Sequence, residues 1–216
     1  MIKYLLFDLD GTITDPKEGI TKCVQYALSK FDIEEECDNL LSFIGPPLTD
    51  SFMDFYGFDK QKAELAINYY RERYAKIGLF ENSAIDGIHE VLEKLKNSGY
   101  TLAVATSKPT CFAISICEKY DFSKYFDIIM GSELDGTRTK KSEIIYEVLK
   151  QLNSKPEEAI MVGDRKYDII GAKEVGTASI GVRFGYAEDG ELEEAGADFI
   201  VGTPNELLTC ILEMKI

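Results

Sequence analysis

The chain has 216 residues, of which 45% are apolar and 29% are charged. At roughly 150 residues per domain this is enough for one domain with a sizeable insertion, and the composition is not that of a disordered chain. Acidic residues outnumber basic ones 38 to 24, and the net charge of -14 argues against nucleic acid polymers and anionic membrane surfaces as partners.

The cysteines and the single histidine narrow the chemistry further. The five cysteines form no CxxC pair, and no stretch approaches the roughly 20 apolar residues of a membrane helix, so we expect a cytoplasmic protein. With a single histidine and no cysteine cluster, a zinc site of His and Cys ligands is not expected, and catalysis by histidine would have to use His89. If the protein is an enzyme, carboxylates are expected to carry its chemistry.

Short apolar runs alternate with helical patterns along most of the chain. The expected strands are residues 2–7, 101–105, 126–130, 159–162, 179–182 and 199–201. The expected helices between the later strands are residues 87–98, 110–120, 142–152 and 167–175, with a capping box at 203–206 opening a last helix. This alternation predicts an α/β fold with a doubly wound, Rossmann-like parallel sheet.

The long gap after the first strand breaks the alternation. Residues 16–82 hold no convincing strand, and their apolar side chains recur at the spacing of helices. We therefore expect a core of residues 1–15 and 83–216 and an inserted helical domain of residues 16–82. Breaker residues on both sides of the insertion, around Pro16 and Gly87, could act as hinges.

Two aspartates follow the first expected strand. Asp8 and Asp10 are two residues apart, so in an extended chain their side chains point to the same side, beyond the strand end where open α/β sheets bind ligands. Gly11 permits a tight turn next to a ligand. Because adjacent carboxylates repel each other, the pattern favours a divalent cation such as Mg2+, which would also accept a substrate phosphate.

Hydroxyl and basic residues occur at two later element boundaries. Thr106 and Ser107 end a strand just before a helix, where hydroxyl and backbone N–H groups suit phosphate oxygens. Arg138, Lys140 and Lys141 precede another helix, a position that is unfavourable for cations and so favours a functional reason for at least one of them. Each pattern alone is also typical of an ordinary helix cap or a solvated turn.

A second pair of aspartates follows the strand at 159–162. Asp164 comes at the strand end, and Asp168 lies four residues later, on the same side if a helix begins there. All four patterns occur in order, and each lies at or just beyond a strand's carboxyl end. Their conjunction is far less expected by chance than any one of them.

Taken together the motifs resemble those of the haloacid dehalogenase superfamily. FDLDGT resembles the first motif, Thr106 the second, Lys141 the third and GDRKYD the fourth. The helical insertion is similar to the cap of the phosphoglycolate phosphatase-like branch, in which Gly45, Pro46 and Pro47 would form the substrate-facing loop. GSELDGTR and GDRKYDIIGAK also resemble a 5'-nucleotidase-like subgroup.

The resemblance implies a Mg2+-dependent phosphatase that acts on a small phosphorylated metabolite. Asp8 would attack phosphorus, and Asp10 would protonate the leaving group and then activate water. The metal would be held by Asp8, Asp164 and the backbone carbonyl of Asp10, with Asp168 behind them. The phosphoryl group would be bound by Thr106, Ser107 and Lys141.

Some choices stay open at this stage. The family often has a proline after the third-motif lysine, where this chain has Ser142, and the neighbouring Lys140 competes with Lys141 for the role. A β-phosphoglucomutase-like mutase would share all four motifs, and a non-catalytic phospho-acceptor or binding protein is a further alternative. Phosphoglycolate and nucleoside 5'-monophosphates are both compatible substrates. The other basic residues near the motifs, Lys108 and Arg165 among them, could be local counter-charges for a phosphate, but a solvated surface position is the default expectation.

Overall fold

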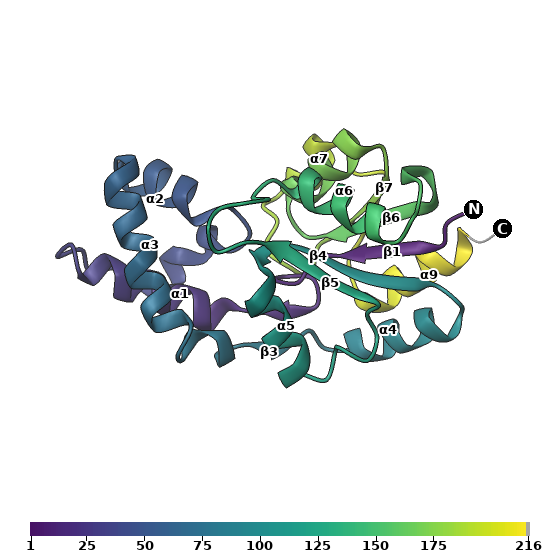
Figure 1. The fold of residues 1–216 in the computed structure, drawn as a ribbon, viewed down its shortest axis with the longest axis horizontal. Coiled ribbons are helices and arrows are strands. Elements are labelled where there is room, and N and C mark those ends of the chain that lie inside the picture. Colours follow the sequence, from purple (N-terminus) through teal and green to yellow (C-terminus); the bar gives the residue numbers. More distant parts are fainter. Residues whose placement is uncertain (215–216) are drawn as a thin grey trace. The chain divides into compact units, whose positions relative to one another are not determined.

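A computed structural model of the protein describes residues 1–214. Its centre is a six-stranded parallel sheet in the order β5-β4-β1-β6-β7-β8 (Figure 1). The strands are β1 (Tyr4–Phe7), β4 (Thr101–Pro109), β5 (Ile128–Ser132), β6 (Ala159–Gly163), β7 (Ala178–Val182) and β8 (Phe199–Val201). The expected doubly wound sheet is therefore confirmed.

The first strand is central in the sheet. Phe7 of β1 aligns with Val104 of β4 on one side and with Val162 of β6 on the other. The carboxyl ends of these three strands therefore come to the same edge. Because the connection from β1 runs to β4 on one side, whereas the connection from β6 runs to β7 on the other, this edge is the topological switch point at which open α/β sheets bind ligands.

Helices cover both faces of the sheet. In Figure 1, α6 and α7 lie on one face, and α4, α5 and α9 lie on the other. The helices are α4 (Ile88–Asn97), α5 (Thr110–Lys119), α6 (Lys141–Gln151), α7 (Lys166–Val175), α8 (Glu191–Ala195) and α9 (Pro204–Glu213). Aliphatic side chains of α6 and α7 pack on the strands, and Ile144 and Ala172 belong to the same buried cluster as Leu6 and Met161. The expected start of α9 is confirmed, since the Thr203 hydroxyl accepts the Glu206 N–H at 3.2 Å.

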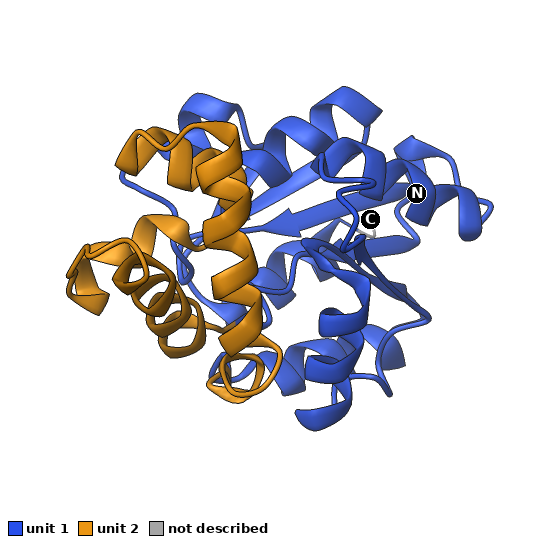
Figure 2. Cartoon of the chain, turned by 60° about the vertical axis from the view of Figure 1, so that its left-hand side comes forward, with its two compact units in different colours: residues 1–14, 84–216 blue, residues 15–83 orange. Residues whose placement is uncertain are grey.

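The chain divides into two compact units (Figure 2), residues 1–14 with 84–216, called the sheet unit here, and residues 15–83, called the helical unit. The helical unit contains α1 (Lys17–Ser29), α2 (Leu48–Tyr56), α3 (Lys60–Tyr74) and the short 3₁₀ helices η1 (Cys37–Phe43) and η2 (Gly78–Phe80). Its buried side chains recur at helical spacing, and the Asp59 carboxylate caps α3 by accepting the Lys62 N–H at 2.8 Å.

Several elements differ from the sequence prediction. Strand β4 continues to Pro109, four residues past the expected end, and β5 begins and ends two residues later than expected. The short strands β2 (Thr14–Asp15) and β3 (Ser83–Ala84) form a separate two-stranded sheet that was not predicted.

None of the helices in the described part of the chain combines the length and the apolar character that crossing a bilayer requires.

Candidate active site

Asp8 follows β1 directly and is buried. Its backbone N–H donates to the Val162 carbonyl of β6 at 2.8 Å, so the residue still belongs to the hydrogen-bonded ladder of the sheet. The Leu9 N–H donates to Asp8 Oδ1 at 2.8 Å. Only 5% of Asp8 is exposed. Its hydrogen bonds to Val162 and Leu9 therefore hold its position without a ligand.

The chain turns sharply after Asp10. Gly11 has φ +81°, a conformation that favours glycine, and its N–H donates to the Thr14 carbonyl at 2.7 Å. A Cβ atom at Gly11 would lie 2.2 Å from Oδ2 of Asp164. The glycine therefore serves two purposes, the turn itself and the close approach of this loop to Asp164.

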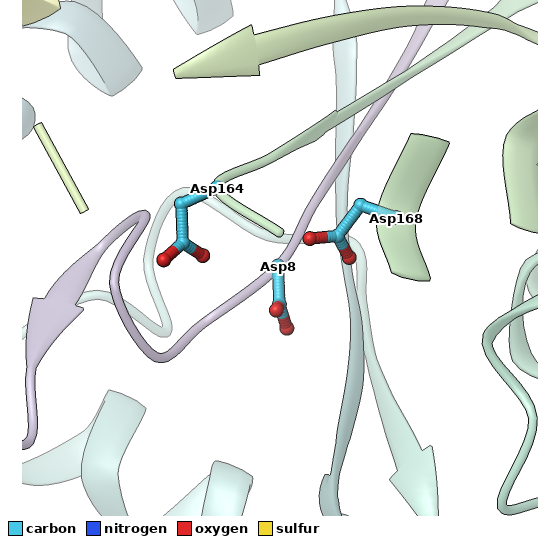
Figure 3. A group of neighbouring side chains, drawn as sticks. All are labelled: Asp8, Asp164 and Asp168. Atoms are coloured by element: carbon cyan, nitrogen blue, oxygen red, sulfur yellow. The ribbon is translucent and has the colours of Figure 1, made fainter. Parts of the chain in front are cut away.

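Three buried carboxylates gather beyond the strand ends. Asp8 follows β1, Asp164 follows β6, and Asp168 lies in the first turn of α7 (Figure 3). Ligand atoms of all three lie within 4.8 Å of one another. The Asp164 carboxylate is held by the Thr12 hydroxyl at 3.2 Å and by the Tyr186 N–H at 2.8 Å. Burial, together with the charges of Asp168 and Asp8, raises the pKa of Asp164 well above its usual value.

Lys141 joins two of these carboxylates. Its ammonium lies 2.9 Å from Oδ1 of Asp8 and 2.8 Å from Oδ1 of Asp168, and it donates to the Ala105 carbonyl at 3.1 Å. Burial lowers the pKa of Lys141, but the charges of Asp168 and Asp8 outweigh burial and raise it above its usual value. Lys140 is exposed at the helix start, so of the two candidate lysines the structure brings Lys141 to Asp8.

The start of α7 holds Asp168 in place. The Arg165 N–H donates to Asp168 Oδ2 at 3.1 Å, which caps the helix. A Cβ atom at Gly163 would lie 2.1 Å from the Asp168 carboxyl carbon, so glycine is required where the strand passes this side chain. Burial raises the pKa of Asp168, and the Lys141 charge partly offsets that rise.

The hydroxyl residues lie where β4 departs from regular pairing. Ala105 aligns with Met130 of β5, but Pro109 aligns with Ser132, so two extra residues are accommodated in β4. Thr106, which is 1% exposed, lies in this bulge, and its hydroxyl oxygen accepts the Lys108 N–H at 3.3 Å. Bulges of this kind redirect side chains beside active sites.

Asp10 has a different partner from the other carboxylates. Its Oδ2 lies 2.9 Å from the Lys108 ammonium, and both side chains are largely buried. Its Oδ1 is buried without a hydrogen-bond partner among the described residues. Burial raises the pKa of Asp10, and the Lys108 charge partly offsets this effect.

The default expectation that Lys108 and Arg165 are solvated is wrong. Lys108 is 8% exposed and Arg165 is 6% exposed. The Arg165 guanidinium donates to Glu191 at 2.9 Å, so a carboxylate far along the chain compensates its burial. Nothing in the local sequence distinguishes either residue from a surface cation.

Two parts of the site escaped the sequence analysis. The Tyr186 N–H reaches Asp164, and a Cβ atom at Gly185 would lie 2.4 Å from Cβ of Asp164. The only sequence signal for this loop is a glycine close after a strand.

The expected substrate loop of Gly45, Pro46 and Pro47 lies in the helical unit directly before α2.

The residues present fit a hard divalent cation. The cluster offers only carboxylate oxygens, the ligands that Mg2+ prefers, and Lys141 is the cation that pairs with two of its three members. The side chain of Asp10 lies on Lys108 and is not part of this cluster. The cluster could therefore hold a metal ion through Asp8 and Asp164, with Asp168 beside them.

Comparison with known proteins identifies the class. The model of the haloacid dehalogenase-like hydrolase family matches residues 5–182. The chain belongs to this family and is an enzyme of its phosphatase type. The family resemblance inferred from the motifs is confirmed.

Individual relatives are similar over nearly the whole chain. A 5'-nucleotidase of Pseudomonas aeruginosa is 50% identical over 87% of this chain and 86% of its own length. The tyrosine-protein kinase PtkA of Mycobacterium tuberculosis is 35% identical over 96% of this chain and 68% of its own length. A phosphoglycolate phosphatase of Vibrio parahaemolyticus is 26% identical over 97% of this chain and 96% of its own length. The crystal structure of a predicted phosphatase from Clostridium acetobutylicum is 49% identical, covers 99% of both chains and superposes with a TM-score of 0.96.

Proposed function

We propose that the protein is a Mg2+-dependent phosphatase that hydrolyses small phosphomonoesters through an aspartyl-phosphate on Asp8. The observation that carries this proposal is the buried Asp8 carboxylate, held at Oδ1 by Lys141 and by the Leu9 N–H at the carboxyl end of the central strand. A nucleophile held in this way is already oriented before the substrate arrives.

In the first step an oxygen of Asp8 attacks phosphorus and the bond from phosphorus to the leaving alcohol breaks. The leaving oxygen takes a proton from Asp10, whose Oδ1 has no other partner. In the second step water attacks the phosphorus of the aspartyl-phosphate and gives its proton to Asp10, and the bond from phosphorus to the Asp8 oxygen breaks. Inorganic phosphate is released, and both carboxyl groups return to their starting states.

Asp8, Asp164 and the backbone carbonyl of Asp10 would hold Mg2+, with Asp168 fixing Lys141 beside them. When bound, the ion would offset the repulsion between the carboxylates and draw the phosphate group to the site. Thr106, the N–H of Ser107 and Lys141 would bind the phosphoryl oxygens and stabilise charge in the transition state.

The helical unit would serve as a cap that recognises the leaving group, with the loop of Gly45, Pro46 and Pro47 facing the substrate. Its position as an insertion between β1, which Asp8 follows, and β4, which carries Thr106, supports this role. Nucleoside 5'-monophosphates and phosphoglycolate are the proposed substrates, because relatives named 5'-nucleotidase and phosphoglycolate phosphatase are similar over most of this chain.

The proposal is tested with p-nitrophenyl phosphate as the substrate. We expect the purified protein to hydrolyse it with Mg2+, EDTA to stop the reaction, and Asp8→Asn to leave a folded protein without turnover. The matched control is Asp121→Asn, an exposed aspartate that pairs with Lys124 and is expected to keep full activity. Near-normal turnover by Asp8→Asn would show that the nucleophile is misassigned. A panel of phosphate metabolites ranked by kcat/KM would then test the two proposed substrates.

A further inference from the structure

Lys108 is a buried lysine whose ammonium contacts a proposed catalytic carboxylate. Its side chain is 5% exposed, and its Nζ lies 2.9 Å from Oδ2 of Asp10. Lysine is almost never this buried unless it is paired, because removing an ammonium from water is costly. The pair is therefore a built feature of the site.

The fold makes a specific accommodation for Lys108. The residue lies in the bulge of β4, and its backbone N–H donates to the Thr106 hydroxyl oxygen at 3.3 Å. The Ser132 hydroxyl of β5 donates to the neighbouring Ser107 carbonyl at 2.8 Å. A Cβ atom at Gly131 would lie 1.9 Å from the Lys108 carbonyl oxygen, so only glycine permits this approach of the two strands. Neighbours on two strands thus fix the backbone from which the Lys108 side chain extends.

The ion pair makes the two oxygens of Asp10 unequal. Lys108 occupies Oδ2, whereas Oδ1 is buried and has no hydrogen-bond partner in the described part of the chain. An unpartnered carboxylate oxygen in a buried position is costly unless a ligand uses it. Oδ2 can accept from the ammonium whether or not Oδ1 carries a proton.

We propose that Lys108 is a positioning residue, which holds Asp10 by Oδ2 so that Oδ1 is the oxygen that exchanges protons with the leaving group and with water. This inference rests on the proposed function, because it assigns a partner to the proposed general acid. The inference gives the two buried lysines different roles. Lys141 acts on Asp8 and the phosphoryl group, and Lys108 acts on Asp10.

The test compares a good and a poor leaving group, p-nitrophenyl phosphate and phenyl phosphate. The readout is kcat/KM, because it covers the steps up to the phosphorylation of Asp8, in which the leaving group departs. Protonation matters more for the poorer leaving group, and a positioned general acid contributes about 100- to 10,000-fold. The variants are Lys108→Met, Lys108→Arg, Asp10→Asn and the double variant Lys108→Met/Asp10→Asn. The matched control is Lys96→Met, which breaks an exposed lysine–aspartate pair with Asp127.

We expect Lys108→Met to lose at least about tenfold more activity on phenyl phosphate than on p-nitrophenyl phosphate. Asp10→Asn should show the same bias, and the double variant should be no worse than Asp10→Asn alone, because Lys108 acts through Asp10. Lys108→Arg should recover part of the loss on phenyl phosphate, since it keeps a cation and N–H donors. The Lys96→Met control should show no bias. If Lys108→Met does not fold, as judged by circular dichroism, Lys108→Gln replaces it with the same expectation.

Equal losses on both substrates, or a rise in KM with kcat unchanged, would show that Lys108 binds phosphate or only supports the fold, and would overturn the inference. Additive losses in the double variant would overturn it as well. Failure of the proposed function looks different. In that case the wild-type protein shows no Mg2+-dependent turnover, or Asp10→Asn itself shows no leaving-group bias.

Discussion

The two units of the chain differ in whether they bury charged side chains. Among residues 1–214 the buried charged side chains all belong to the sheet unit, and they are Asp8, Lys108, Lys141, Asp164, Arg165 and Asp168. In the helical unit the buried polar side chains are Thr21 and Ser51, and neither is charged. Its best-shielded ion pair, between Arg73 and Glu81, is still 19% and 18% exposed at its side chains.

The cores of the two units also differ in the kind of side chain that fills them. The sheet unit packs aliphatic side chains of α6 and α7 on its strands. The helical unit is held by aromatic rings, with Phe43 and Phe52 at 5.1 Å between centroids and Phe52 stacked on Phe58 at 6.0 Å. Stability in the helical unit therefore comes mainly from packing. In the sheet unit, part of that stability is offset by the cost of keeping charges buried at the site.

The largest effect is expected where buried charges depend on one cation. Lys141→Met would leave Asp8 and Asp168 buried without their shared partner, which costs about 3 to 5 kcal/mol. Turnover should disappear as well. Urea unfolding and p-nitrophenyl phosphate hydrolysis measure both effects, with the exposed neighbour Lys140→Met as the control. A stability within about 1 kcal/mol of wild type would show that the site does not depend on this charge balance.

Substitutions in the aromatic core of the helical unit should destabilise the protein without affecting Mg2+ binding at the proposed site. Phe52→Ala removes a fully buried ring and should destabilise the protein by about 3 kcal/mol, whereas Phe55→Ala, on the same helix but 51% exposed, should change stability by less than about 0.5 kcal/mol. Both variants should still be stabilised by Mg2+ in thermal unfolding. Loss of that Mg2+ response in Phe52→Ala would contradict the separation of the two regions.

Metal addition should stabilise the sheet unit through its carboxylates. At about 100 times its Kd, Mg2+ should add about 2.7 kcal/mol to the free energy of unfolding. Asp164→Asn should abolish this gain and, without metal, should be at least as stable as wild type, because it removes one of three crowded charges. Isothermal calorimetry and unfolding with and without Mg2+ test this, with the exposed Asp189→Asn as the control. An undiminished Mg2+ effect in Asp164→Asn would place the metal elsewhere.

The smallest effect is expected for the ion pair of the helical unit. Arg73→Met removes a guanidinium that contacts Glu81 at 2.6 Å and should cost about 1 kcal/mol at neutral pH. The hydrogen bond to Arg73 lowers the pKa of Glu81 below its ordinary value of 4.5. The unfolded chain therefore binds more protons than the folded chain near this pH. The pair's contribution is complete above 4.5 and is lost as the pH falls through the lowered value.

The measurement for this pair is the stability difference between wild type and Arg73→Met as a function of pH. The difference should shrink at acid pH, whereas Lys76→Met, an exposed lysine beyond the end of α3, should show little difference at any pH. A difference that grows toward acid pH would contradict the assigned sign.

Much of the fold could be predicted because each strand of the sheet coincides with a short apolar run. The errors at β4 and β5 have a physical reason. Both strands continue through residues without an apolar pattern, Thr106 to Lys108 in β4 and Gly131 with Ser132 in β5, and glycine and lysine are depleted in strands. Pairing with a neighbouring strand keeps these segments extended, and that contact is not visible in local sequence.

The candidate site could be predicted only where its members end a strand. Asp8, Thr106 and Asp164 follow apolar runs, so their common edge follows from the parallel sheet. Lys108 could not be predicted in the same way, because an isolated lysine after a strand is normally solvated and its burial depends on Asp10 and on the bulge against Gly131.

The covalent mechanism is tested most directly by locating the phosphate on the protein during turnover. The wild-type protein is mixed with p-nitrophenyl phosphate and Mg2+, quenched in acid, reduced with borohydride and mapped by peptide mass spectrometry. Reduction converts an aspartyl-phosphate into homoserine, and we expect that conversion at Asp8 alone, with none in Asp8→Asn. Homoserine at Asp10, Asp164 or Asp168 would contradict the assignment of the nucleophile, and no conversion at any aspartate during active turnover would contradict the covalent mechanism itself.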